Sequence, residues 1–103
     1  MSGEATTGHY KKQMKTIIIR QCSHWGADTK IFRAYSHDER PGSKDRPLGV
    51  SASTTGNAEF GARSCAAKAF IKYVEPKAER DEIETRIALK SIGQGLWIAE
   101  LKS

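Results

Sequence analysis

The sequence predicts an α+β domain: an antiparallel sheet of four or five strands with one main α-helix packed on a face, in the order β-β-β-α-β-β. Three observations lead to this prediction. Apolar or alternating segments separated by turn residues occur three times before residue 55, as in a strand meander. One segment rich in small residues, 57–74, then repeats its apolar side chains at helical spacing. Two shorter strand-like segments follow Pro76.

The size and composition fit one small domain preceded by a tail. The chain has 103 residues, of which 38% are hydrophobic and 28% are charged, which suffices for a single core. Residues 1–13 show no apolar periodicity, so we expect a flexible N-terminal tail and one domain over residues 14–103. No apolar run approaches the ~20 residues that span a bilayer, and the N-terminus has no apolar core. We therefore expect a cytoplasmic protein without a membrane partner.

The first two strands are expected to form an antiparallel hairpin. Lys15–Cys22 contains three consecutive isoleucines, which favour a central strand covered on both faces. Thr29–Ser36 alternates, with Ile31, Arg33 and Tyr35 on one face, so we place it near an edge or beside a binding surface. The connection between the two segments is short and contains turn residues, which favours the hairpin.

A third strand and the main helix follow a long loop. Residues 37–49 combine prolines, glycines and mixed charges, which predicts a loop, and Leu48–Thr54 reads as a short strand at its end. The helix is predicted over Asn57–Val74, because Asn57 can cap its start and Pro76 ends it. Its alanines, glycine and cysteine predict that the helix backbone lies close against the sheet.

The final third of the chain has two interpretations. As a strand, segment 82–91 places Ile83, Thr85, Ile87 and Leu89 on one face and its charged residues, Glu82, Glu84, Arg86 and Lys90, on the other. Helical spacing would align Ile83 with Ile87 and leave Leu89 outside the apolar stripe, so we prefer a strand. Residues 93–95 predict a tight turn, and Leu96–Lys102 predicts a well-buried last strand.

Side chains that could catalyse a reaction or hold a metal are few and scattered. Cys22, His24 and His37 lack the paired spacing of a zinc site. Cys65 lies among alanines, where burial disfavours a reactive thiolate. No glycine pattern matches a phosphate-binding or dinucleotide-binding loop. We therefore expect no enzyme activity, no metal, no cofactor and reduced cysteines.

A basic and aromatic hairpin is the strongest functional signal in the sequence. The net charge is +5, and residues 1–50 carry nine Lys and Arg against five Asp and Glu. Cations that neutralise phosphates, beside rings that stack on bases, are typical of proteins that hold single strands. The residues expected to form such a surface are Arg20, Trp25, Lys30, Phe32, Arg33 and Tyr35. We therefore expect a small binding module with a preference for nucleic acid or another polyanion.

Protein binding, by an interaction module or inhibitor, is the alternative. The loop 37–46 has mixed charges, and segment 75–84 holds five carboxylates, which suit a protein partner better than DNA. An exposed edge strand could pair with another chain, including a second copy of this one. The net charge of +5 also lies in the range that serves solubility alone. Binding to phosphates should weaken steeply with salt, whereas a packed protein interface should not.

Overall fold

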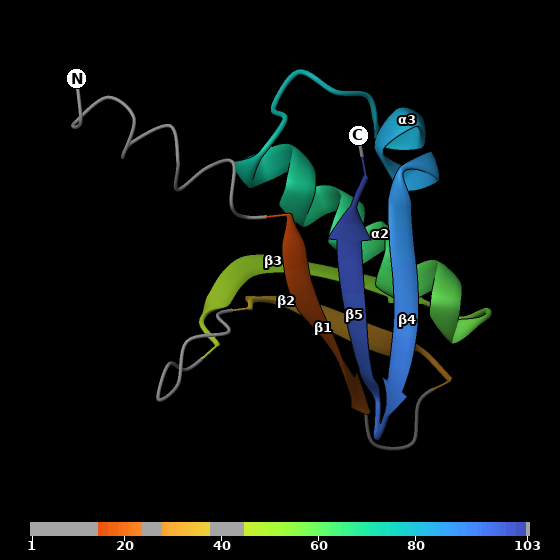
Figure 1. The fold of residues 1–103 in the computed structure, drawn as a ribbon. Helices are drawn as coiled ribbons and strands as arrows, with labels where there is room; N and C mark the ends of the chain where they lie inside the picture. The colour runs from red at the N-terminus through yellow and green to blue at the C-terminus, as the bar shows by residue number, and fades with distance from the viewer. Residues whose placement is uncertain (1–14, 24–27, 38–44, 103) are drawn as a thin grey trace.

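The computed structural model describes residues 15–23, 28–37 and 45–102 (Figure 1). The predicted tail over residues 1–13, Trp25 and most of the predicted loop 37–46 lie outside the described residues. All of the predicted strands and the main helix lie within them.

The described chain forms one five-stranded antiparallel sheet with one main helix packed on it, which confirms the predicted α+β fold. Along the chain, the elements are β1 (Thr16–Ser23), β2 (Lys30–Ser36), β3 (Pro47–Thr54), α2 (Ala58–Tyr73), α3 (Arg80–Thr85), β4 (Ile87–Gly93) and β5 (Leu96–Leu101). The order in the sheet is β3-β2-β1-β5-β4. The predicted central position of the isoleucine strand is therefore correct, and β3 and β4 form the two edges. The predicted cover on both faces is not, because the described helices cover only one face of the sheet.

Helix α2 covers one face of the sheet and lies across all five strands (Figure 1). Ile17 and Ile19 of β1 point to this side and are fully buried in the core with α2. Ile18 points to the other side, yet only 8% of it is exposed although no described helix lies over that side. Its neighbours in the sheet, Tyr35 and Ile98, stand directly opposite it on the two flanking strands.

The start and end of α2 follow the sequence prediction. The Asn57 side chain accepts a hydrogen bond from the Glu59 amide at 3.0 Å, as an N-cap does. Val74 is the C-cap, and its amide donates to the Phe70 carbonyl. The residues that α2 buries are mostly small: Gly61, Ala62, Cys65, Ala66, Ala67 and Ala69, with Phe70 as the only large one. Small side chains let the helix backbone approach the sheet closely.

Gly61 marks the closest approach between α2 and the sheet. A Cβ atom at this position would overlap the ring of Phe32 and lie 2.8 Å from the Cγ2 atom of Thr54. Phe32 is fully buried, and buried side chains are close-packed, so a larger residue at position 61 requires the core to rearrange.

The segment before β4 is a helix, so the predicted strand over residues 82–91 is wrong in its first part. Arg80–Thr85 forms the short helix α3, and β4 begins only at Ile87. The Arg80 side chain pairs with Glu84 one turn later at 3.3 Å, which supports a helix locally. Ile83 and Ile87 are both buried: the first lies on α3 and the second on β4. The apolar alternation of this segment is therefore shared between two elements.

The predicted turn after β4 is confirmed. Gln94 has φ 56° and Gly95 has φ 75°, the two positive values that a tight hairpin turn requires. The glycine at the second position adopts this conformation without a steric penalty. The turn places β5 between β1 and β4 in the sheet.

We predict that Gly61→Ala destabilises the fold. Alanine gains up to ~1 kcal/mol in helix propensity over glycine, but forcing a methyl group against a buried ring costs about 1–3 kcal/mol. We expect a net loss of about 1 kcal/mol in the free energy of unfolding, measured by urea denaturation.

Gly56→Ala is the matched control for this prediction. A Cβ atom at Gly56 meets only Thr54 Oγ1, at an ordinary 3.6 Å, and we expect no loss of stability. A Gly61→Ala variant as stable as the wild type would contradict the close contact between α2 and Phe32.

Candidate nucleic-acid interface

The side of the sheet away from α2, which we call the open face, is not covered by any described helix (Figure 1). Residues paired across an antiparallel sheet point to the same side, so the register gives the composition of this face. One row across the strands contains Tyr35, Ile18, Ile98 and Lys90. The next row contains Arg33, Arg20 and Leu96.

Two arginines stand directly opposite each other at the centre of the open face. Arg20 of β1 pairs in register with Arg33 of β2, and both are exposed. Like charges in this position destabilise a sheet. Within residues 15–23, 28–37 and 45–102, neither arginine forms an ion pair with a carboxylate. Among the described residues, the two guanidinium groups therefore present a double positive charge that no carboxylate pairs with.

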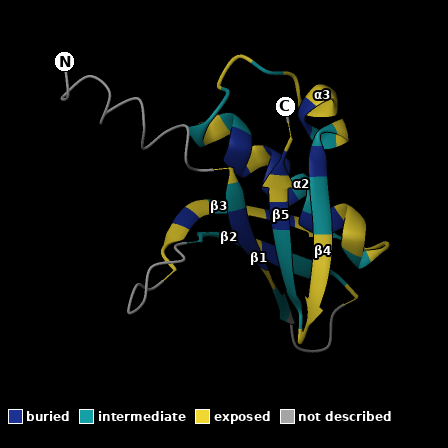
Figure 2. Ribbon diagram, viewed as in Figure 1, coloured by how far each residue is buried: buried dark blue, intermediate teal, exposed yellow. Residues whose placement is uncertain are grey.

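An aromatic ring lies beside this pair of charges. The Arg20 guanidinium carbon lies over the Tyr35 ring, 5.7 Å from its centroid, within the range of a cation–π contact. Tyr35 is half-buried and its row continues with Ile18 and Ile98. Cationic and apolar surfaces thus meet on the same part of the open face, and Figure 2 shows its strands partly accessible rather than fully buried.

The structure brings together three of the six residues that the sequence suggested. Arg20, Arg33 and Tyr35 are neighbours on the open face. Lys30 points to the opposite side, where its Nζ atom donates to the Gly56 carbonyl at 3.1 Å. Trp25 lies outside the described residues.

Phe32 is a correction to the predicted site. It is fully buried in the core beneath α2, so its ring is not available to a ligand on the sheet surface. Adjacent strand residues point to opposite sides, and α2 covers the side of Phe32 rather than that of Arg33. Lys90, in contrast, is exposed on the open face and was missed, because its distance from the hairpin depends on the order of the strands in the sheet.

The cysteine on α2 lacks the properties of a nucleophile. Cys65 is fully buried, and its Sγ atom lies 3.5 Å from the Phe32 carbonyl oxygen. Burial raises the pKa of its thiol to about 12, so the thiol stays protonated at neutral pH. Both cysteines are free thiols. Among the described residues, no group of three or more His, Cys, Asp or Glu side chains could hold a metal ion.

We predict that thiol reagents distinguish the two cysteines. In the folded protein, Cys22 is half-buried and Cys65 is buried, so only Cys22 should react quickly with a maleimide. In denaturant, both should react. Rapid modification of Cys65 in the folded protein, followed by mass spectrometry of the peptides, would contradict its burial.

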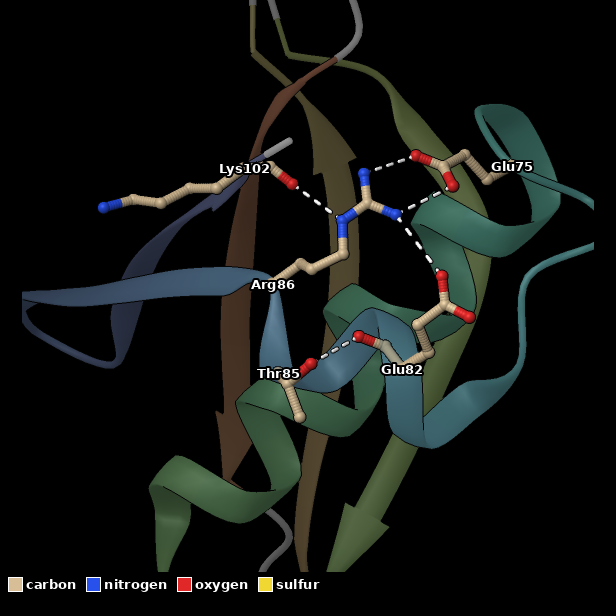
Figure 3. Close-up of polar contacts among 5 residues, drawn as sticks. All are labelled: Glu75, Glu82, Thr85, Arg86 and Lys102. Carbon is tan, nitrogen blue, oxygen red and sulfur yellow. Dashed lines mark hydrogen bonds and ion pairs between the residues drawn. The ribbon is translucent and has the colours of Figure 1, made fainter.

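The most connected polar cluster in the described chain is structural, and we call it the Arg86 cluster (Figure 3). Arg86 makes a two-pronged contact with the Glu75 carboxylate, at 2.9 and 2.7 Å, and its Nε atom donates to the Lys102 carbonyl at 2.8 Å. Glu82 lies 3.9 Å away. The cluster thereby joins the loop after α2, the end of α3 and the end of β5. Because the Arg86 guanidinium already donates these hydrogen bonds, it is poorly available to a ligand.

A second group of charges lies between α2 and α3 and is also internally paired. Arg63 donates to the carbonyls of Glu84 and Ile87 at 3.1 and 2.7 Å and pairs with Glu59 at 3.3 Å. Arg80 pairs with Glu84 and donates to the Ser64 hydroxyl. The shallow depression between these helices is lined by such residues. The open face differs from these two clusters, because no described carboxylate pairs with Arg20 or Arg33 on it.

We predict that removing the Glu75 carboxylate destabilises the protein in a pH-dependent way. Hydrogen bonds from Arg86 lower the pKa of Glu75. The ion pair therefore contributes fully above the pKa that Glu75 has in the unfolded chain, and its contribution disappears as pH falls through the lower folded value. The stability difference between wild type and Glu75→Gln should be largest near about pH 7 and smallest near about pH 3, measured by urea unfolding.

Glu82→Gln is the matched control, because Glu82 lies farther from the same guanidinium, at 3.9 Å. We expect this change to have a smaller effect at both pH values. An equal loss for the two variants would contradict the dominant role of Glu75 in the Arg86 cluster.

Comparisons of the chain with protein-family models, with curated proteins and with solved structures found no match. Neither described helix is long and apolar enough to cross a bilayer. The chemistry of the open face is therefore the basis for assigning a function.

Proposed function

We propose that this protein is a small non-enzymatic binding module that binds nucleic acid, as a polyanion, through the open face. The observation that carries the proposal is the pair of facing arginines, Arg20 and Arg33, which have no acidic partner among the described residues. Lys90 on the same face adds a third positive charge.

The electrostatics of the open face support a ligand with several negative charges. Two like charges opposite each other cost stability in the free protein, and a phosphate backbone relieves this repulsion when it binds. Binding also releases condensed counterions from the nucleic acid, which favours association at low salt. Glu100 is the acidic residue that the register places on this face, and it stands opposite Thr16 and Ala88 rather than an arginine.

We predict that the double change Arg20→Glu and Arg33→Glu weakens binding at least ~10-fold. Binding of a fluorescent mixed-sequence oligonucleotide is measured by anisotropy over a series of salt concentrations. With three phosphate contacts from Arg20, Arg33 and Lys90, the logarithm of the wild-type affinity should fall with the logarithm of salt with a slope of about −2. The double variant should have a shallower slope.

The matched control reverses two lysines that lie off the open face, Lys72 and Lys77. Both are exposed, Lys72 on α2 and Lys77 in the loop after it. The Lys72→Glu and Lys77→Glu variant has the same net charge as the arginine variant but should keep most of the affinity. Equal losses in the two variants would mean that net charge, and not this face, drives binding.

A second candidate function is binding of a protein at a sheet edge. Two carbonyls of β3 accept hydrogen bonds from α2, since Lys68 donates to Ser51 and Tyr73 donates to Leu48. On β4, the first residue, Ile87, accepts one from Arg63. Edge strand β4 carries Ile92, which is 46% exposed. This edge fits a partner strand better than β3 does. Such binding would resist salt, and the change of Arg20 and Arg33 would leave it largely intact.

A further inference from the structure

We infer that the open face binds single-stranded nucleic acid in preference to a duplex, with a base stacked on Tyr35. This inference rests on the proposed function and specifies the form of its ligand. It follows from the width of the sheet, from the apolar residues between its charges and from the small number of those charges.

The width of the sheet opposes entry into a duplex groove. Five strands about 4.8 Å apart make a surface about 19 Å across. The major groove of B-form DNA is about 12 Å wide and admits a helix or a two-stranded ribbon. The sheet, which carries Arg20 and Arg33 on its inner strands β1 and β2, is therefore too wide to enter the major groove of an undistorted duplex.

The apolar residues of the open face need a ligand with accessible bases. Ile18 beside Tyr35 is only 8% exposed, but Ile98 in the same row and Leu96 in the row of the two arginines are partly exposed. A duplex presents phosphates on its outside and would leave these side chains in contact with water or charge. A single strand can turn its bases onto the sheet, where they cover apolar surface while its phosphates lie at the cations.

Tyr35 and Arg20 together form a stacking platform. The guanidinium of Arg20 lies over one face of the tyrosine ring, 5.7 Å from its centroid, so a base that stacks on this face displaces the guanidinium, which can then pair with a phosphate of the same strand. Ser51 of β3 stands opposite Arg33 in the register and is exposed. Its hydroxyl group extends the row of the two arginines on the open face, where it can donate to or accept from a nucleotide.

The charge on the open face is too small for binding by phosphates alone. Arg20, Arg33 and Lys90 are opposed by Glu100 on the same face. Three phosphate contacts give a weak, salt-sensitive complex, so useful affinity requires base contacts as well. Stacking on one aromatic side chain changes affinity by about 5-fold to 150-fold, which is enough to separate a single strand from a duplex.

The test compares one mixed-sequence oligonucleotide in three forms at the same salt: as a single strand, as a duplex with its complement, and as a single strand with abasic sites. We expect the intact single strand to bind at least ~10-fold tighter than either other form. Tyr35→Leu should weaken binding of the intact strand by about 10-fold and barely change binding of the abasic strand. Tyr35→Phe keeps the ring and should bind like the wild type.

Phe60→Leu is the matched control. Phe60 lies on α2 and is 66% exposed, so this change also replaces an accessible aromatic ring by an aliphatic side chain, away from the open face. It should leave binding of all three forms unchanged. Thermal unfolding of each variant, followed by circular dichroism, verifies that it is folded.

The possible outcomes separate the inference from the proposed function. If no form binds, the proposed function is wrong and the inference falls with it. If single strand, duplex and abasic strand bind equally, and the arginine variant binds none of them, the proposed function stands and the preference for single strands is overturned. If sedimentation shows a dimer that Tyr35→Leu dissociates, the open face is covered by a second copy of the chain, which also overturns the inference.

Discussion

The close contact between α2 and the sheet is the interaction on which the rest of the structure depends. Gly61 allows the helix to lie against Phe32 without a gap, and the other inward residues of α2 are almost all small. Long side chains on the flanks of the same helix reach both edges of the sheet: Lys68 donates to the Ser51 carbonyl and Arg63 to the Ile87 carbonyl. One helix thus covers a whole face and binds both edge strands, which leaves the second face of the described sheet without a helix.

The Arg86 cluster stabilises the end of the fold that lies beyond the C-terminus of α2. Arg86 follows α3 and precedes β4, and its guanidinium holds Glu75 from the loop after α2. Backbone hydrogen bonds hold the end of β5 as well: the Lys102 amide donates to the Arg86 carbonyl, and the Leu101 amide donates to the Lys15 carbonyl. The end of β5 is therefore fixed between the start of β1 and the start of β4. This explains how the last strand of the chain lies inside the sheet rather than at its edge.

Local sequence signals predicted most of the helices and strands. The boundary between α3 and β4 and the buried side of β2 depend on contacts between elements that are distant in the sequence. Asn57 and Pro76 bracket α2, and the isoleucines of β1 require a buried strand, so both were predictable. Ile83 and Ile87 satisfy the spacing of a helix as well as that of a strand, and only their packing against α2 separates α3 from β4. Which side of β2 is buried depends on where α2 lies, so Phe32 and Arg33 could not be assigned to core and surface with certainty from alternation alone.

The pairing of charges on the open face argues for a ligand rather than for solubility. A sheet face that only has to stay soluble is stabilised by opposite charges across its strands, and a single carboxylate opposite Arg20 would supply this. The chain instead places Arg33 there, with the partly exposed Leu96 on the other side of Arg20. Local features that oppose stability concentrate where a protein functions. The repulsion between Arg20 and Arg33, set in a partly apolar surface, is such a feature, and the proposed single-stranded ligand would relieve the repulsion with its phosphates and cover the apolar residues with its bases.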